Sequence, residues 1–370
     1  MYEQDDLFDK SPDFTPETMT EKKPVYNNAP QDFYARSKEL RINSLLVAIY
    51  IGVQLILSFF AGMYINANYS YLEEALNNVE ETVAVDFVVA PNLEESTKED
   101  YPYLITISGE FKNNYEREIP EFYLDIELFD ILNQSIGIHT ISHKEFLTSQ
   151  TFNFSEEVLS SNEVVSITKN IAAAPPTLLT NGIYLLITIV IGISLVLIDK
   201  ERFINDFQSF KKDYKGYISQ MFIGFLMIYG VLIVSSMLLS FFGVTETSNN
   251  ELLIQQMFDD NPFNLAILFF NLVIFTPVIE ELIFRKVMFS YFEPRLKPVI
   301  TIILTGLIFA FMHIQGDYIQ MIPYGGMGIV LGYVYYKSNR NIYTAIGSHL
   351  LNNLFSWLVY VLTIYGLLQF

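Results

Sequence analysis

The sequence predicts a polytopic α-helical membrane protein of about seven spans with an all-β extracytoplasmic insertion. Of its 370 residues 51% are hydrophobic, yet the formal net charge is -19, so apolar and charged residues must occupy different segments. Acidic residues outnumber basic ones by 8 to 3 in residues 1–35 and by 20 to 5 in residues 65–177, which leaves the remainder nearly neutral. The acidic balance argues against nucleic acid as a partner, and the lack of cysteine excludes disulfides and thiolate sites.

The apolar runs divide the chain into segments. Residues 1–40 are expected to form a disordered acidic cytoplasmic tail, because their first part is rich in Pro and Asn and lacks apolar periodicity. The first transmembrane helix is expected within 42–64, as an uncleaved signal anchor that begins too far from Met1 for a signal peptide. Further runs long enough to cross a ~30 Å hydrocarbon core lie at 178–198, 217–242, 263–284, 298–313, 319–336 and 342–367.

The distribution of Lys and Arg in the short loops predicts the orientation. The 199–216, 285–297 and 337–340 loops carry basic residues, whereas the 243–262 loop carries none. We therefore expect a multi-pass plasma-membrane protein with a cytoplasmic N-terminus and residues 65–177 outside the cytoplasm. The style of the insertion and the Asn-, Ile-, Tyr- and Phe-rich composition favour a Gram-positive bacterial source.

Residues 65–177 are expected to fold as a separate β-domain. Apolar and polar residues alternate at 103–107, 122–128 and 151–154, and turn-forming residues stand between these runs. This pattern predicts a small antiparallel sandwich, which weakly resembles the immunoglobulin-like modules found outside many Gram-positive membranes. Residues 178–262 would then hold linking transmembrane helices.

The last hundred residues contain ionisable groups inside predicted spans, where such groups are costly and therefore functional candidates. Glu281 and Arg285 are four residues apart and can pair on one helical face, whereas Glu280 is rotated about 100° away. In a low-dielectric site Glu280 would suit the role of a general base. The alternative is that both glutamates end the helix at the interface, with Arg285 and Lys286 as anchors.

Two further helices bring imidazole and amide groups. His313 closes the fifth expected span, and His349 and Asn353 share one face of the last span. Glu280, His313, His349 and Asn353 offer ligands to a divalent metal such as zinc, with a position left for water. Alternatively, Glu280 and one histidine activate water directly, while Asn353 and the other histidine stabilise the oxyanion. The glycines at 325, 326, 328 and 332 are expected to serve close helix packing.

The motifs Glu280-Glu281-x-x-x-Arg285, Phe309-x-x-x-His313 and His349-x-x-x-Asn353, in this order, resemble the CPBP intramembrane protease family, also called type II CAAX prenyl endopeptidases or Abi proteins. The resemblance covers about 265–360 and implies a protease core within 263–367 that is open to the cytosolic side. By it, Glu280 would activate water, Glu281 and Arg285 would support the site, and His313, His349 and Asn353 would bind metal or the oxyanion. Bacterial members are linked to peptide processing and bacteriocin immunity.

The sequence therefore predicts an intramembrane endopeptidase of the metalloprotease type that cleaves a membrane-associated protein or peptide. Whether a metal or glutamate alone drives the reaction stays open. The alternative is a non-catalytic scaffold or immunity protein that acts through residues 65–177 on a cell-envelope partner. A transporter is disfavoured, because the chain lacks an internal repeat.

Overall fold

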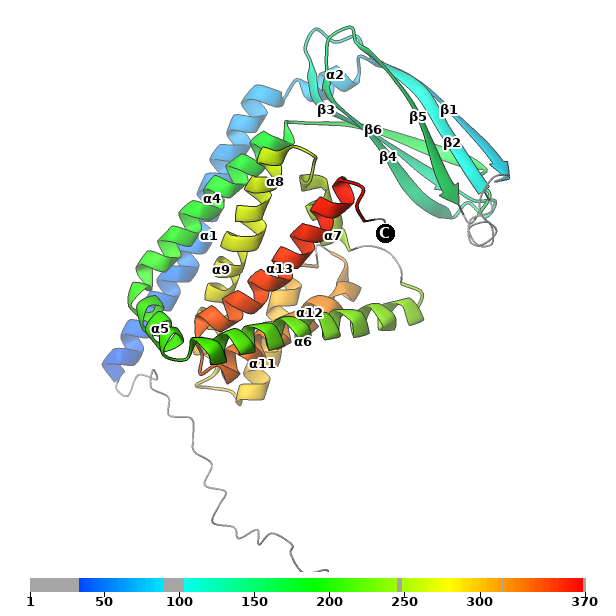
Figure 1. The fold of residues 1–370 in the computed structure, drawn as a ribbon. Helices are drawn as coiled ribbons and strands as arrows, with labels where there is room; N and C mark the ends of the chain where they lie inside the picture. The colour runs from blue at the N-terminus through cyan, green and yellow to red at the C-terminus, as the bar shows by residue number, and fades with distance from the viewer. Residues whose placement is uncertain (1–32, 90–102, 161, 245–247, 315, 369–370) are drawn as a thin grey trace, which may run out of the picture.

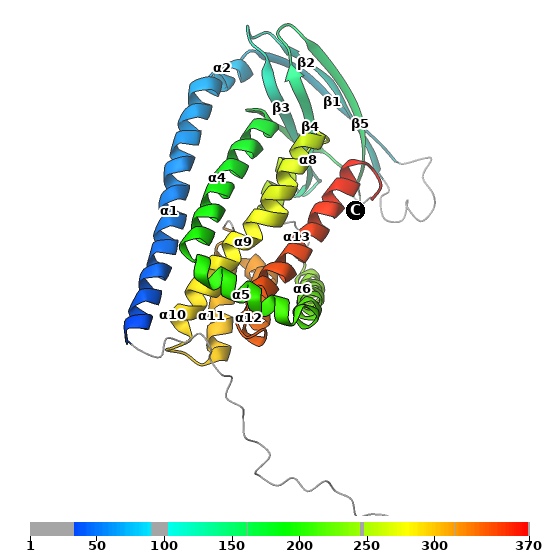
Figure 2. The ribbon, with the colours of Figure 1, turned by 60° about the vertical axis from the view of Figure 1, so that its left-hand side comes forward.

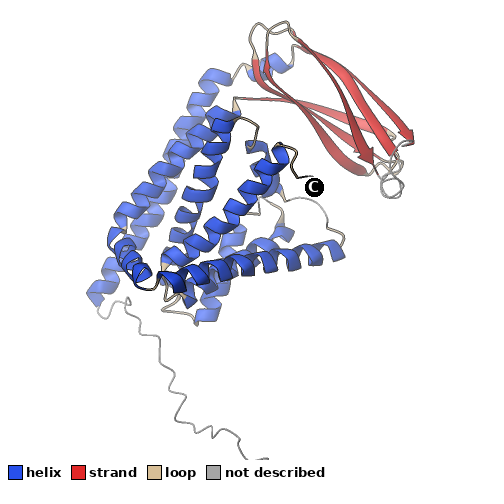
Figure 3. Cartoon of the chain, in the orientation of Figure 1, coloured by secondary structure: helices blue, strands red, loops and turns tan. Residues whose placement is uncertain are grey.

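The computed structural model describes residues 33–89, 103–160, 162–244, 248–314 and 316–368, and it shows a helical domain with a β-domain at one end (Figures 1 and 3). Most of the expected tail, residues 1–32, lies outside the described residues. The helical elements are α1 (Phe33–Tyr69), α2 (Leu72–Leu76), α4 (Thr177–Ile198), α5 (Lys200–Lys212), α6 (Tyr214–Phe241), α7 (Asn249–Met257), α8 (Pro262–Leu268), η2 (Phe269–Phe275), α9 (Thr276–Glu281), η3 (Leu282–Met288), α10 (Phe289–Phe292), α11 (Pro298–Phe311), η4 (Tyr318–Gln320), α12 (Met321–Lys337) and α13 (Ile342–Ile364).

Five helical segments within the described residues are long and apolar enough to cross a membrane. They are Lys38–Tyr69, Thr177–Ile198, Tyr214–Phe241, Pro262–Phe292 and Ile342–Ile364. The other two expected spans are the 14-residue α11 and the 17-residue α12. At 1.5 Å per residue these helices reach only about 21 and 25 Å, less than a ~30 Å core. The expected count of seven full spans is therefore not confirmed.

Two helices extend beyond their expected ends. Helix α1 begins at Phe33, so residues 33–40 are helical and not part of a disordered tail. Ion pairs from Lys38 to Glu201 (3.4 Å) and from Arg202 to Glu39 (3.4 Å) connect this extension to α5. The helix that begins at Pro262 continues to Phe292, and so the expected 285–297 loop is helical in its first half.

The helices are not all parallel. Helices α1, α4, α9 and α13 run in roughly one direction, whereas α6 crosses them steeply, lengthwise in Figure 1 and end-on in Figure 2. Gly224 of α6 lies against Ser348 of α13, where a Cβ atom would come within 2.4 Å of the Ser348 hydroxyl. Helices α11 and α12 pack closely through Gly306 and Gly328, where a Cβ on Gly328 would lie 2.7 Å from the Gly306 oxygen. The expected packing role of Gly328 is thus confirmed.

The loops that were expected on one side of the membrane meet in the structure. Lys286 contacts Asp206 (3.1 Å), and Asn341 donates to the Asp206 carbonyl (2.7 Å), at the end that holds the basic loops. At the opposite end, Lys144 of the β-domain contacts Asp259 in the loop before α8 (2.9 Å). These contacts agree with the predicted grouping of loops. Which end faces the cytoplasm stays a prediction.

The β-domain consists of two antiparallel sheets of three strands. The strands are β1 (Val79–Val89), β2 (Tyr103–Asn113), β3 (Ile119–Phe129), β4 (Ser135–Phe146), β5 (Thr151–Ser160) and β6 (Ser166–Ala174), in the orders β1-β2-β5 and β4-β3-β6. Alternating residues of both sheets form one apolar core, with Phe111, Phe122 and Phe146 fully buried. The expected antiparallel β insertion is confirmed, whereas its immunoglobulin-like character is not.

A buried carboxylate joins the β-domain to the membrane helices. Glu121 of β3 accepts hydrogen bonds from the Thr177 amide and the Thr177 hydroxyl, each at 2.5 Å, and from the Tyr123 hydroxyl at 2.5 Å. Thr177 is the first residue of α4, so the carboxylate satisfies an amide that a helix N-terminus leaves unpaired. Strand β3 is thereby held directly on the end of α4.

Candidate active site

Glu280 and Glu281 lie on an irregular part of a long helix. The six-residue α9 carries both glutamates between two π-helical segments, η2 and η3. Pro277 removes one helical hydrogen bond and crowds the carbonyl four residues earlier, and a widened turn on its N-terminal side accommodates this without breaking the helix. Segments of this kind are frequent at functional sites.

The two glutamates point into different surroundings, as predicted. The Glu281 side chain is fully buried and pairs with the equally buried Arg285, with 3.1 Å between Oε2 and Nε. Arg285 also donates to the Gly328 carbonyl on α12 (3.0 Å), and its guanidinium lies over the Phe309 ring. Arg285 is thus an internal support and not an interfacial anchor, and the same burial holds for Lys286.

Glu280 faces both histidines. Its Oε1 lies 3.6 Å from His313 Nε2, and its Oε2 lies 3.8 Å from His349 Nε2. These distances exceed those of direct hydrogen bonds. Among the described residues Glu280 Oε2 is buried without a hydrogen-bond partner. The structure therefore brings together the Glu280 carboxylate of α9, the His313 imidazole from the turn after α11 and the His349 imidazole of α13.

Each histidine is oriented through its other ring nitrogen. His349 Nδ1 donates to Glu281 Oε1 (2.9 Å), and His313 Nδ1 donates to the Phe309 carbonyl (2.7 Å). Since both acceptors require a proton on Nδ1, the neutral form of each ring presents a lone pair at Nε2. The His313 ring is stacked between Phe309, at 4.3 Å between centroids, and Tyr324, at 5.4 Å.

Glu280, His313 and His349 are of the residue types that hold a divalent metal, but among the described residues their present spacing is wider than a metal site requires. The Nε2 lone pairs of His313 and His349 face different oxygens of the Glu280 carboxylate, and acceptors directed toward one another are complementary to a cation or a bound water. In a tetrahedral zinc site, ligand atoms lie about 3.3 Å apart, so the observed separations need to close by a few tenths of an ångström. The contacts of Nδ1 with a carboxylate and a carbonyl are those that metal-binding histidines make. As they stand, no three His, Asp or Glu side chains in the described part of the chain reach metal-ligand spacing.

Asn353 lies beside this cluster and is engaged elsewhere. Its amide donates to the Leu272 carbonyl of η2 (2.9 Å), and its oxygen accepts from Asn352 (3.1 Å). Within the described residues no contact joins Asn353 to Glu280 or to either histidine. The structure thus joins five of the expected site residues through direct contacts, namely Glu280, Glu281, Arg285, His313 and His349. Asn353 instead connects α13 to η2.

Sequence reasoning missed several residues around the cluster. Tyr324 stacks on His313 from α12, and a pocket reaches Glu280 from helices α1 and α4. Neither the stacking of Tyr324 nor the pocket corresponds to a sequence motif. The only sequence indication of these residues was an isolated Tyr or Gln within an apolar run.

Together these observations indicate a multi-pass membrane protein that holds a carboxylate and two imidazoles within its helical domain. Residues 262–355 match the family model described as Type II CAAX prenyl endopeptidase Rce1-like. The match confirms the resemblance inferred from the three motifs and indicates a protease of the intramembrane kind for this quarter of the chain. No curated protein and no solved structure matches the chain.

Proposed function

We propose that the helical domain is an intramembrane endopeptidase in which Glu280 activates the attacking water. The observation that carries this proposal is the orientation of both Nε2 atoms toward the Glu280 carboxylate, each set by a hydrogen bond at Nδ1. A scaffold protein gains nothing from a buried carboxylate oxygen without a partner, because such a group costs free energy.

Glu280 would take a proton from water as the oxygen attacks the peptide carbonyl, and would return it to the departing amine. Glu281 would hold His349 through Nδ1 and fix its tautomer, while Arg285 would hold Glu281. The Nδ1 hydrogen bonds favour metal binding over oxyanion stabilisation, since a neutral ring with its proton on Nδ1 has no proton at Nε2 to donate. Glu280, His313 and His349 would hold such a metal, which when bound lowers the pKa of water and polarises the carbonyl.

Glu280→Gln tests the proposal, because it keeps the shape of the side chain and removes the base. The purified protein in lipid vesicles would be incubated in ¹⁸O-water with two kinds of peptide, unmodified transmembrane peptides and farnesylated C-terminal CAAX peptides. Mass spectrometry then detects new C-termini that carry the heavy isotope. We expect cleavage by the parent protein and by the surface control Glu201→Gln, and loss of at least about 100-fold in Glu280→Gln.

Equal cleavage by Glu280→Gln and the parent would disprove the role of this base. Pull-down of cell-envelope proteins by the same variants addresses the scaffold alternative, which predicts unchanged behaviour of Glu280→Gln in every assay. Metal content measured with and without His313→Ala and His349→Ala would test the metal assignment separately.

A further inference from the structure

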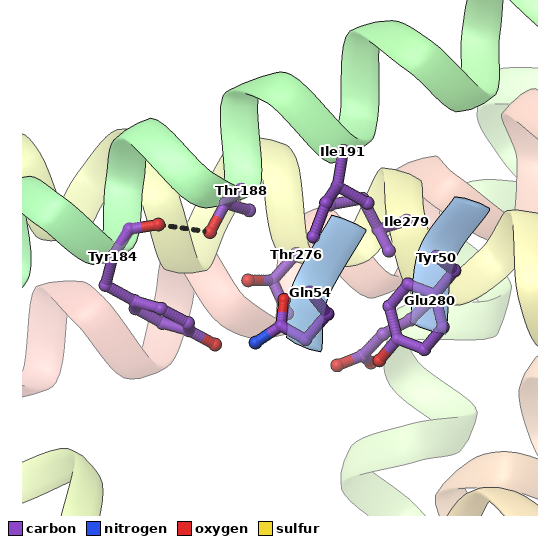
Figure 4. Close-up of a pocket in the computed structure, with 8 residues that line it drawn as sticks. All are labelled: Tyr50, Gln54, Tyr184, Thr188, Ile191, Thr276, Ile279 and Glu280. Atoms are coloured by element: carbon purple, nitrogen blue, oxygen red, sulfur yellow. Dashed lines mark hydrogen bonds between the residues drawn. The ribbon is translucent and has the colours of Figure 1, made fainter. Parts of the chain in front are cut away.

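A pocket of about 120 Å³ opens beside Glu280 on the face that α1 and α4 cover (Figure 4). It is lined by two residues of α1, three of α4 and three of α9, namely Tyr50, Gln54, Tyr184, Thr188, Ile191, Thr276, Ile279 and Glu280. Helices α1 and α4 lie outside the segment that matches the endopeptidase family. This part of the site is therefore contributed by helices outside the matched segment.

The polar groups of the pocket converge and are poorly satisfied. In Figure 4 the Gln54 amide lies between the Tyr184 hydroxyl and the Glu280 carboxylate, and all three turn toward the same space. Among the described residues neither the Tyr50 nor the Tyr184 hydroxyl has a hydrogen-bond partner. The Gln54 amide makes one long contact, 3.4 Å to the Ser58 hydroxyl on its own helix.

The accessible hydrogen-bonding groups of Gln54, Tyr50 and Tyr184 are complementary to a polar occupant of the pocket. Polar side chains in the membrane normally find partners, since each unsatisfied group costs free energy in hydrocarbon. Gln54 offers both a donor and an acceptor, and each phenol offers a donor and an acceptor. This combination matches a peptide backbone, which presents one N–H and one C=O at each residue.

A substrate of the proposed protease requires such a partner. A peptide bond in a helix is shielded by its neighbours, so the segment to be cleaved must unwind and lose its internal hydrogen bonds. Within a membrane, unwound backbone is tolerated only where protein or a water-filled cavity satisfies it. The pocket meets this requirement directly beside the carboxylate that would activate water.

We propose that this pocket binds the main chain of an unwound substrate segment, with Gln54 and Tyr184 pairing its free amide groups. The proposal rests on the proteolytic function inferred above and assigns the first transmembrane helix to the substrate site. The substrate class is a membrane-spanning peptide whose helix is weak near the scissile bond. Because Tyr184 and Thr276 both precede the level of Glu280 along helices that start at the β-domain, the bound segment lies on the β-domain side of Glu280.

Binding can be measured without turnover. The full chain carrying Glu280→Gln, in lipid nanodiscs, would be titrated with a fluorescent apolar peptide of about 25 residues, enough to span the bilayer. One peptide carries three central glycines, which weaken its helix, and the comparison peptide carries alanines there. We expect the glycine peptide to bind about 10-fold more tightly, and Gln54→Leu and Tyr184→Phe each to remove about 10-fold of its affinity. Tyr64→Phe, which removes a hydroxyl from an exposed position of the same helix, serves as the matched control.

The outcomes separate this proposal from the protease itself. Equal binding of both peptides, undetectable binding of both, or unchanged affinity in Gln54→Leu and Tyr184→Phe would overturn the pocket assignment while leaving the Glu280 chemistry intact. Slower hydrolysis of every peptide with unchanged binding would also overturn it and would make the pocket a path for water. Selective binding without any hydrolysis by the parent protein would refute the protease and support the pocket.

Discussion

Glu281→Gln should be the most destabilising conservative substitution near the site. Glu281 and Arg285 are both fully buried, with 3.1 Å between Oε2 and Nε. Two unit charges at this separation attract by about 5 kcal/mol at an effective dielectric constant of 20. Removing one partner leaves the Arg285 charge buried, which typically costs 3–5 kcal/mol. Thermal unfolding of the purified protein should therefore begin about 6–20 °C lower.

The control is Glu201→Gln, which removes an exposed carboxylate from its contact with Lys38. Exposed pairs contribute about 0–1 kcal/mol, so this variant should unfold with the parent protein. Glu281→Gln should also lower hydrolysis by about 10–100-fold, because His349 loses the acceptor that sets its tautomer. A change in stability below about 1 kcal/mol would refute the view of Glu281 as the counter-charge of Arg285.

Three further substitutions or conditions test other parts of the structure. Gly328→Ala should destabilise by about 1–3 kcal/mol in a thermal unfolding assay, because its Cβ would lie 2.7 Å from the Gly306 oxygen; parent-like unfolding would contradict this packing. Glu121→Gln should lower the free energy of unfolding by about 1–3 kcal/mol and speed hydrogen exchange at residues 174–180, because a single amide oxygen cannot accept from Thr177 and its neighbours as a carboxylate does. Unchanged exchange would argue against the role of Glu121 in joining β3 to α4. Burial lowers the pKa of His143 below its usual 6.5, so the unfolded state binds more protons than the folded state. The β-domain should therefore lose stability as the pH falls through about 6.5. Hydrogen exchange of β4, corrected for intrinsic rates, should show this loss in the parent protein and not in His143→Phe.

The sequence was sufficient to predict the centre of the site, because helical periodicity separates Glu280 from Glu281 and the three polar motifs, with the family they resemble, indicated that His313 and His349 approach Glu280. The separation of Glu280 from Glu281, the pairing of Glu281 with Arg285 and the approach of His313 and His349 to Glu280 are all found in the structure. Asn353 shares the face of His349 as periodicity requires, yet it bonds to η2. Periodicity specifies a direction along one helix and says nothing of the neighbour that occupies it.

The spans were harder to predict, because hydropathy measures composition and not helix ends. Helices α11 and α12 are apolar yet too short to cross fully, and the turn between them brings His313 to the depth of Glu280. The charges of Arg285 and Lys286 indicated a loop, but both side chains form buried ion pairs that offset the cost of their desolvation. The helix therefore continues to Phe292. The π-helical turns, the stacking of Tyr324 and the pocket residues Gln54 and Tyr184 depend on packing between distant segments.

The Glu121 carboxylate at the N-terminus of α4 also has a mechanical consequence. From Thr177, where Glu121 grips the helix, seven residues lead to Tyr184 in the wall of the pocket, a rise of about 10 Å. A helix is stiff along its axis, so a force that tilts the β-domain is transmitted along α4 to the wall of the pocket. The β-domain and the wall of the pocket beside Glu280 are thus connected through a single helix.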